Sequence, residues 1–292
     1  MAFLLNGHSI PGIIYGTTLK TPGLLDSALR VGFRAFDSAG TRKFHREDID
    51  GSDFRSVIGD HDTKLSRDDI LIQTKFCPAG SGQADPVPFD SSDSLGTQVL
   101  KSMKRSLEDL QIDVVDVYFM HRPMYDIEET LAVWRMMEHL VSRGVVRYLG
   151  VCNVDYPTLS TIFERATIKP AFVQNRFKRS NGYDRRVKKF CTENRISYQV
   201  FGVLSAQNAD LLSLPVVKEM ARKEDISVQQ ALRLLVLASG KTSGLEMCLL
   251  THTAKMEHMK NSLFLAARSG EVDGETIVAF DRALTVLVEG GY

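Results

Sequence analysis

The sequence predicts a single (β/α)₈ barrel, and three observations support this fold class. The chain has 292 residues, enough for a barrel of this type, which typically needs about 250. Short apolar segments recur along it, most of them followed by a stretch with helical periodicity, which is typical of β/α units. No Gly/Ser linker or low-complexity tract divides the chain. We therefore expect one domain over residues 1–292.

Eight apolar segments are the predicted strands, at residues 13–15, 35–37, 70–75, 114–121, 148–151, 172–175, 198–203 and 246–250. Eight parallel strands suit a closed barrel. Helical periodicity predicts helices at residues 24–31, 100–110, 130–143, 156–166 and 217–222. Trp134, Met136 and Met137 lie in one of these helical patterns and are expected to pack in the core or against a helix.

Composition excludes several classes of function. Lys plus Arg and Asp plus Glu number 36 each, so no net field favours nucleic acid or an anionic membrane. The four cysteines form no C-x-x-C pair and the histidines no H-E-x-x-H pattern, so we expect no metal. The first apolar run is too short for a signal peptide, and no run of eighteen apolar residues occurs. A soluble, cytoplasmic protein is expected.

The alternative architecture is a doubly wound dinucleotide-binding sheet, and it lacks its sequence signature. Such a sheet needs a glycine-rich turn after the first strand, but G-x-G-x-x-G is absent and Gly16-Thr17-Thr18 offers one glycine only. No G-x-S-x-G elbow or P-loop occurs either. The sequence therefore favours the (β/α)₈ barrel over the doubly wound sheet.

Polar residues stand at the ends of the predicted strands, where the chemistry of a barrel is carried out. They are Asp37, Lys75, His121, Asn153, Gln174 and Asn175. Any one of them is more often a cap or an ion-pair partner than a catalyst. Together they indicate an active site, because a lysine paired with an aspartate at a barrel mouth perturbs the pKa of its neighbours.

Six segments resemble motifs of the aldo-keto reductase family, in family order: IYGT (14–17), GFRAFDSA (32–39), QTKF (73–76), HRP (121–123), GVCN (150–153) and VQN (173–175). They run from the first predicted strand to the sixth. Residues 67–123 and YQVF (198–201) resemble a fungal-type branch in particular. The resemblance implies a TIM barrel, a role in secondary metabolism and NADPH-dependent reduction of a small carbonyl metabolite.

The resemblance also implies a reaction centre of Asp, Tyr, Lys and His, of which Asp37, Lys75 and His121 are present. In the family the tyrosine protonates the carbonyl oxygen, the lysine lowers its pKa, the aspartate pairs with the lysine and the histidine orients the substrate. In RKFHRE (42–47), followed by Gly51, His45 occupies the tyrosine position.

Three interpretations of His45 stay open. An imidazolium could donate the proton, because its reference pKa of about 6.5 is closer to neutrality than that of a phenol. A nearby Lys75 would disfavour that charged form. The remaining cluster could instead catalyse an isomerisation, dehydration or cyclisation without hydride transfer. The third interpretation is a catalytically silent binding protein.

By the same resemblance, NADP(H) is the expected cofactor. Asn153 and Gln174 would hold the nicotinamide carboxamide, and Phe201 would stack on its ring. Thr253 and His258 would lie beside the adenosine phosphate and the adenine, and Gly16 and Thr17 complete the predicted cofactor site. No sequence motif predicts the substrate. The segments that would determine it are the loops at residues 77–93 and 124–128 and the tail after Leu263.

Overall fold

The computed structural model describes residues 2–5, 8–18, 21–79 and 87–290. Eight parallel strands close into a barrel in the order β10-β3-β4-β5-β6-β7-β8-β9, with helices between successive strands. The predicted (β/α)₈ barrel is therefore confirmed. A short antiparallel pair, β1 (Ala2–Leu5) and β2 (His8–Pro11), precedes the barrel and lies outside the predicted elements.

The barrel strands overlap all eight predicted segments. They are β3 Ile13–Gly16, β4 Ala35–Asp37, β5 Leu71–Phe76, β6 Val115–Met120, β7 Val146–Cys152, β8 Phe172–Arg176, β9 Ser197–Phe201 and β10 Met247–Thr251. The predicted strand at 198–203 ends early, at Phe201. Gly202 has a φ of 72°, and this left-handed conformation breaks an extended strand.

The helices are α1 Leu24–Val31, α2 Glu47–Val57, α3 Leu95–Leu110, α4 Ile127–Ser142, α5 Tyr156–Arg165, α6 Arg185–Glu193, α7 Pro215–Glu224, α8 Val228–Ala238, α9 Met256–Arg268 and α10 Gly274–Glu289. Side-chain caps begin several of them: Ser94 accepts a hydrogen bond from Thr97 N, and Asp155 accepts one from Thr158 N. Such caps satisfy amide groups that the first helical turn leaves unpaired.

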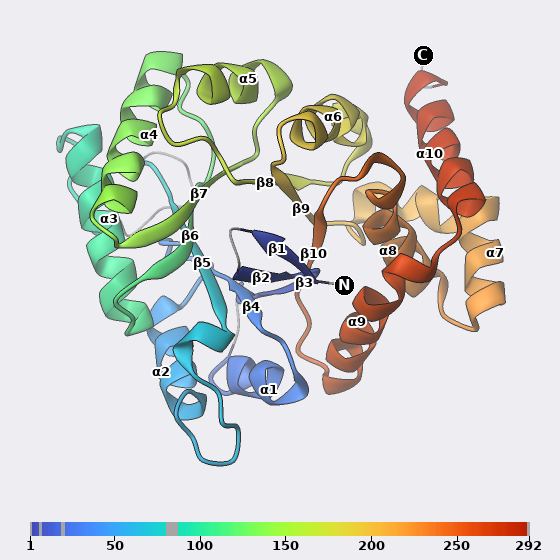
Figure 1. Cartoon of the computed structure of the whole chain (residues 1–292), viewed down its shortest axis with the longest axis horizontal. Helices are drawn as coiled ribbons and strands as arrows, with labels where there is room; N and C mark the ends of the chain where they lie inside the picture. The colour runs from blue at the N-terminus through green and yellow to red at the C-terminus, as the bar shows by residue number, and fades with distance from the viewer. Residues whose placement is uncertain (1, 6–7, 19–20, 80–86, 291–292) are drawn as a thin grey trace. The chain divides into compact units, whose positions relative to one another are not determined.

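The chain groups into two compact units. The larger unit comprises Ile14–Val173 with His252–Met259, and the smaller unit comprises Met1–Ile13, Gln174–Thr251 and Lys260–Tyr292. Within the larger unit, β4 to β7 pair in parallel, and α2, α3 and α4 lie outside these strands (Figure 1). A single domain over residues 1–292 stays a prediction.

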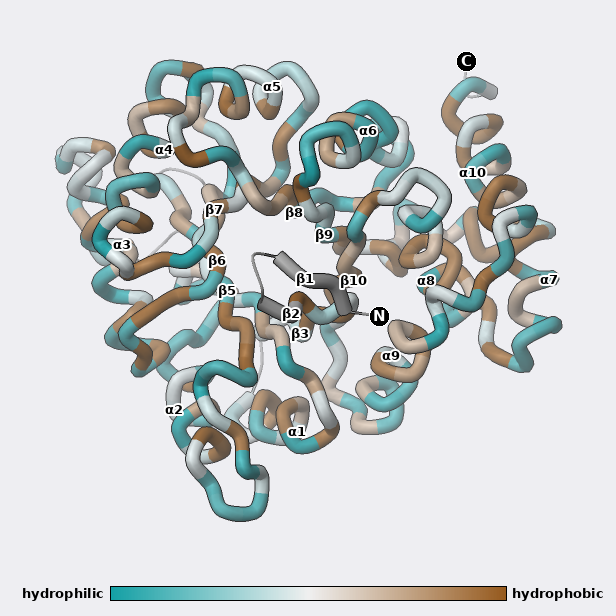
Figure 2. The backbone as a smooth tube through the Cα atoms, viewed as in Figure 1, coloured by the Kyte–Doolittle hydropathy of each residue, from teal (hydrophilic) through white to brown (hydrophobic). Residues whose placement is uncertain are grey.

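The core of the larger unit lies on both faces of its strands. Every residue of β5 and β6 is buried, as expected of parallel strands covered by helices. Hydrophobic and hydrophilic residues alternate around α4 (Figure 2). Trp134 and Met137 are 1% and 0% exposed, so their predicted core packing is confirmed. Met136 is half-buried, and its terminal methyl group lies against Gly96 of α3, as expected of helix packing.

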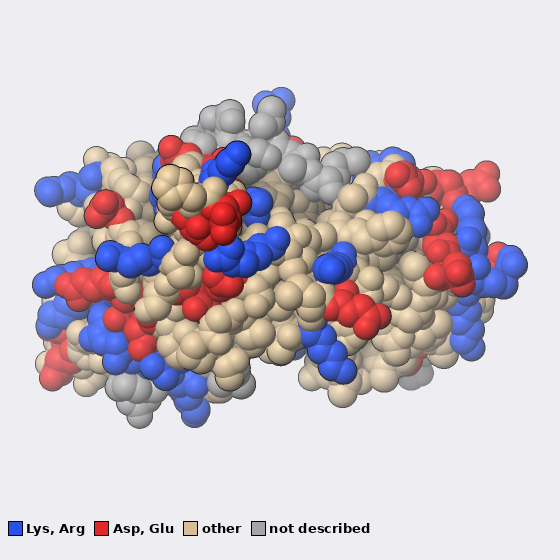
Figure 3. All heavy atoms as spheres, turned by 90° about the horizontal axis from the view of Figure 1, so that it is seen from below, with Lys and Arg blue, Asp and Glu red and all other residues tan. Residues whose placement is uncertain are grey.

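The surface carries both signs of charge. On the face shown in Figure 3, acidic and basic side chains are intermixed. Several form ion pairs, such as Arg30 with Asp26 and Lys101 with Asp93, at 3.1 and 2.7 Å. This mixture agrees with the balanced composition and gives no extended patch of one sign on that face.

The predicted loop at residues 77–93 follows β5. Its residues 80–86 lie outside the described residues, and residues 87–93 form turns and bends that lead to α3. The loop contributes Val87 to a small apolar cluster with Ala39 and Cys77. Part of this loop therefore packs beside the segment that follows β4.

Gly51 allows α2 to pack directly against the end of α3. A Cβ atom at this position would lie 2.2 Å from the carbonyl oxygen of Asp109 and 2.7 Å from the carbonyl carbon of Leu110. Both are backbone atoms, so no rotamer change relieves the clash. The close approach of the two helices depends on a residue without a side chain.

We expect Gly51→Ala to lower the free energy of unfolding by about 2–4 kcal/mol, because the helices must move apart. Urea denaturation measures this change. Gly274→Ala is the matched control, since no atom lies within 4 Å of its Cβ position, and it should be close to neutral. Equal stabilities of the two variants would contradict the packing argument.

Candidate active site

A buried ion pair joins the ends of β4 and β5. Lys75 Nζ lies 2.6 Å from Asp37 Oδ1, and the two side chains are 4% and 7% exposed. The ammonium also donates to the Ser38 carbonyl oxygen at 2.7 Å, and Gln73 Nε2 donates to the same Asp37 oxygen at 2.5 Å. Strand register produces this arrangement, because Asp37 is paired with Gln73 and Lys75 follows two residues later. Each buried charge is therefore compensated.

His45 lies in the turn that connects β4 to α2. Its backbone N–H and that of Phe44 both donate to the Thr41 carbonyl oxygen, which closes the turn. The side chain is 9% exposed, and its Nε2 lies 3.3 Å from Thr18 Oγ1. Among the described residues, Nδ1 has no hydrogen-bond partner.

Burial, followed by the nearby Lys75 cation, lowers the pKa of His45 to about 3. The imidazole is therefore neutral at pH 7 in this structure. An imidazolium at that pH would cost about 5 kcal/mol, at 1.36 kcal/mol for each pH unit above the pKa. The expectation that Lys75 disfavours the charged form agrees with this direction.

His121 follows β6 and is also neutral. Burial and then Lys75 lower its pKa to about 4. Its Nδ1 lies 3.3 Å from the sulfur of Cys77, and its carbonyl oxygen accepts a hydrogen bond from Asn153 Nδ2 at 2.9 Å. Lys75 and Asp37 both influence the pKa values of His45 and His121. The larger unit thus brings all four predicted catalytic residues into one electrostatic environment.

Two buried acids on α2 were not among the predicted site residues. Glu47 accepts hydrogen bonds from Thr74 Oγ1 at 2.5 Å and from Ser106 Oγ at 2.8 Å, and burial raises its pKa to about 7. Burial raises the pKa of Asp50 to about 7 as well. The only sequence feature that could have indicated these two acids is the high content of acidic residues in EDIDGSD (47–53).

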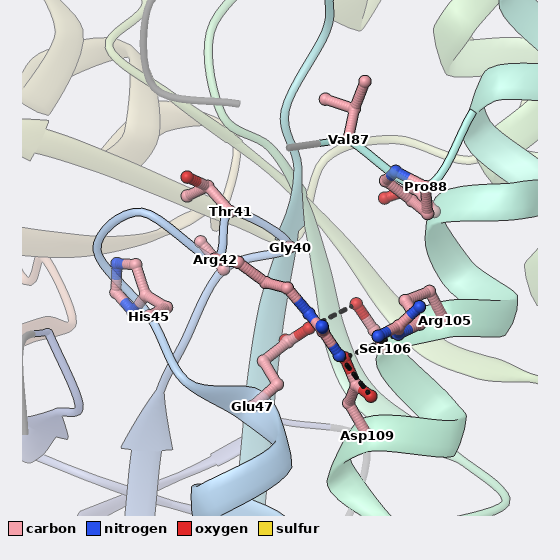
Figure 4. Close-up of a pocket in the computed structure, with 12 residues that line it drawn as sticks. Gly40, Thr41, Arg42, His45, Glu47, Val87, Pro88, Arg105, Ser106 and Asp109 are labelled. Carbon is pink, nitrogen blue, oxygen red and sulfur yellow. Dashed lines mark hydrogen bonds and ion pairs between the residues drawn. The ribbon is translucent and has the colours of Figure 1, made fainter. Parts of the chain in front are cut away.

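Glu47 also lines a pocket of about 170 Å³ between the segment after β4 and α3 (Figure 4). Arg42 and Arg105 share the Asp109 carboxylate at its edge, at 3.1 and 2.8 Å. His45 contributes to the same lining. His45 therefore lies beside the polar side chains of this pocket in the larger unit.

The predicted cofactor residues fall into both units. In the larger unit, Gly16 pairs with Asp37 across the strands, and Thr17 N donates to the Asp37 carbonyl oxygen at 3.0 Å. The Thr253 carbonyl oxygen accepts a hydrogen bond from the Tyr15 hydroxyl at 2.7 Å. Asn153 and His258 are exposed. These side chains remain accessible in the segments that follow β7 and β10.

In the smaller unit, Gln174 and Phe201 are organised by their own neighbours. Gln174 is 3% exposed, and its Nε2 donates to Gln199 Oε1 at 2.9 Å. Phe201 is half-buried, and the guanidinium of Arg176 lies 4.8 Å from the centroid of its ring. No sequence motif predicts this contact between Arg176 and Phe201.

The described residues contain no group of three or more His, Cys, Asp or Glu that could hold a metal ion. All four cysteines are free and buried. No helix in the described part of the chain is both long and apolar enough to cross a membrane.

We expect Glu47 to lower the stability of the protein as the pH rises from about 4.5 to about 7, against the opposite contribution of His45 and His121, whose lowered pKa values favour the folded state as the pH rises. The folded-state pKa of Glu47 is raised above its ordinary value of 4.5, so the unfolded chain releases this proton first and is favoured by rising pH. Glu47→Gln should remove on the order of 3 kcal/mol of this loss. Urea denaturation at a series of pH values measures it.

The exposed Glu108→Gln variant is the control and should keep the full pH dependence. Asp50 retains part of the slope in both variants because its folded-state pKa is raised too. An unchanged slope in Glu47→Gln would show that Glu47 is ionised in the folded protein at neutral pH.

Comparison with known proteins places these observations in a family. The sequence model described as "Aldo/keto reductase family" matches residues 18–243. The chain is 29% identical over 258 residues to mouse aldo-keto reductase family 1 member C21, covering 75% of this chain and 74% of that protein. It is 27% identical over 263 residues to the glycerol 2-dehydrogenase (NADP(+)) of Hypocrea jecorina, covering 78% and 77%.

Solved structures agree on the fold. The aldo-keto reductase of Bombyx mori in complex with NADP superposes with a TM-score of 0.77 at 19% identity, covering 97% of this chain and 92% of that one. An aldo/keto reductase from Brucella melitensis gives 0.74 at 22%, covering 98% and 99%. The family consists of oxidoreductases that use NADP(H) and act on small carbonyl compounds. With a family match over most of its length, this chain belongs to the aldo/keto reductase family.

Proposed function

We propose that this protein is an NADP(H)-dependent oxidoreductase of a small carbonyl compound, with His45 in the position of the family's tyrosine. A fungal-type branch, the cytoplasm and secondary metabolism stay part of this proposal. The observation that carries it is the buried Lys75–Asp37 pair, 2.6 Å apart, with two imidazoles in its field. A pair of this kind at a barrel mouth is typical of a catalytic centre.

Lys75 supplies the positive charge of the proposed centre. Its ammonium uses two of its three N–H groups on Asp37 and on the Ser38 carbonyl oxygen. This anchoring holds the cation in a buried position, where it stabilises negative charge that develops on a carbonyl oxygen. Because the environment is dry, the effect is larger than it would be in water.

His45 and His121 act in this proposal as neutral hydrogen-bond donors. A pKa of about 3 leaves His45 uncharged at neutral pH, so we assign it the task of polarising the carbonyl rather than donating a proton as imidazolium. A neutral imidazole can polarise a carbonyl group in this way. The expected cost is a lower rate than a tyrosine would give, since the site lacks a strong acid.

The donor set fits a nicotinamide cofactor. In the larger unit Asn153 offers a carboxamide, and in the smaller unit Gln174 offers a carboxamide and Phe201 an aromatic ring; the resemblance to the family assigns these three residues to the nicotinamide. Thr253, just before α9, would meet the adenosine phosphate, and His258, in the first turn of α9, would meet the adenine; the start of a helix of this length provides free N–H groups. When bound, NADPH supplies the hydride.

A reaction without hydride transfer is the weaker candidate. Isomerisation, dehydration or cyclisation would need a base in the cluster of Lys, His and Asp, and His45 and His121 are its two imidazoles. With pKa values of about 3 and 4, both are poor proton acceptors, so the same burial that removes the acid also weakens the base. A silent binding protein would need no buried ion pair at this position.

We expect His45→Tyr to increase the rate of NADPH oxidation by about 10² with glyceraldehyde or dihydroxyacetone as the substrate. A phenol beside Lys75 can donate its proton outright, and general acid catalysis contributes roughly this factor. Absorbance of NADPH measures the rate. Fluorescence titration of the wild type and the variant with NADPH, and with NADH for comparison, measures cofactor binding separately.

His45→Phe is the matched control, because it adds a ring of similar size without the hydroxyl and should gain nothing. Failure of the wild type to bind NADPH at millimolar concentration would overturn the proposal. If NADPH binds but His45→Tyr gains no activity, the reaction is of another type. Incorporation of deuterium next to the ketone of dihydroxyacetone in D₂O would then identify proton transfer.

A further inference from the structure

A thiol and an imidazole meet beside the Lys75–Asp37 pair. Cys77 directly follows β5, and His121 directly follows β6. The last residues of the two strands, Phe76 and Met120, are paired with one another. The His121 N–H donates to the Phe76 carbonyl oxygen at 3.0 Å. The parallel register therefore fixes the two residues side by side, with 3.3 Å between Cys77 Sγ and His121 Nδ1.

Both members of this pair are neutral. Burial raises the pKa of the Cys77 thiol to about 12, and burial and Lys75 lower the pKa of His121 to about 4. The thiol keeps its proton, and the imidazole carries a single N–H, on one ring nitrogen or the other. A neutral thiol of this kind is a poor nucleophile, so the contact is a hydrogen bond and not a reactive dyad.

The surroundings of the thiol decide the direction of this hydrogen bond. Among the described residues, the other acceptor beside Cys77 Sγ is the Lys75 carbonyl oxygen, at 3.9 Å. That oxygen already accepts the Gly40 N–H at 3.1 Å. The thiol proton therefore has its better acceptor in Nδ1, and the proton of the ring is left on Nε2.

The rest of His121 is held as well. Asn153 Nδ2 donates to its carbonyl oxygen at 2.9 Å, so the backbone is anchored on both sides of the peptide. Cys77 is 1% exposed, whereas His121 is half-buried. The nitrogen that meets the thiol thus contacts a buried group.

We propose that Cys77 is a positioning residue, whose thiol holds His121 in the Nε2–H tautomer and presents that N–H to the carbonyl substrate. The presentation to substrate rests on the proposed function, but the tautomer does not. Without the thiol, the two tautomers of a neutral imidazole compete, and the donor is present for only part of the time. Loss of one neutral hydrogen bond corresponds to about a 3- to 10-fold effect.

The experiment compares the wild type, Cys77→Ser and Cys77→Ala as full-length proteins labelled with ¹⁵N at histidine. The ¹⁵N chemical shifts distinguish the two tautomers, and His121→Asn identifies the signals of His121 by their loss. The Nε2–H tautomer is expected in the wild type and in Cys77→Ser, whose hydroxyl keeps the donor. Cys77→Ala should show a mixture. Cys248→Ala controls for the loss of a buried thiol, since Cys248 is 0% exposed.

Kinetics with NADPH and the carbonyl substrate give the second readout. Cys77→Ala should lose about 3- to 10-fold in kcat/KM with the Kd for NADPH unchanged, and Cys77→Ser should recover most of the loss. An Nδ1–H tautomer in the wild type, or identical spectra of the wild type and Cys77→Ala, would overturn the proposal. If the wild type turns over no carbonyl substrate, the proposed function fails while the spectra still decide the tautomer.

Discussion

The buried pair of Lys75 and Asp37 is the interaction on which the site depends. Two charges at the ends of neighbouring strands are tolerated because they lie 2.6 Å apart and because Gln73 and the Ser38 carbonyl oxygen provide further hydrogen bonds to them. Removal of either partner would leave a buried charge uncompensated. The parallel register of β4 and β5 is therefore both a structural and an electrostatic requirement, since a shift by one residue would turn Lys75 to the other face.

The same lysine acts in opposite directions on a tyrosine and on a histidine. A phenol is a neutral acid that becomes an anion, so a nearby cation stabilises the product and strengthens the acid without depleting it. An imidazolium is already a cation, so the lysine removes the acidic form from the population. This is the direction found for His45, where burial and Lys75 lower the pKa to about 3. With His45 in the tyrosine position, as we propose, the site would give a different type of assistance.

The strand pattern and the strand ends could be predicted from the sequence because they depend on local alternation and on the topology of a barrel. The positions of Asp37, Lys75 and His121 at the strand ends could be predicted in this way. The buried acids Glu47 and Asp50 could not be predicted, because α2 packs a polar face inward and so shows little apolar periodicity. The hydrogen bond from Cys77 to His121 also escaped prediction. It depends on the register between two strands, and a lone cysteine in the sequence carries no sign of its partner.

A centre without a strong acid depends more heavily on the orientation of its donors. Each neutral hydrogen bond contributes only about 0.5–1.5 kcal/mol, and a misdirected one contributes nothing. The chain fixes the backbone of His121 through Phe76 and Asn153 and its ring through Cys77, whereas Nδ1 of His45 has no partner among the described residues. His121 is therefore the better oriented of the two imidazoles, and its Nε2–H is the donor on which selectivity for a carbonyl oxygen would chiefly depend.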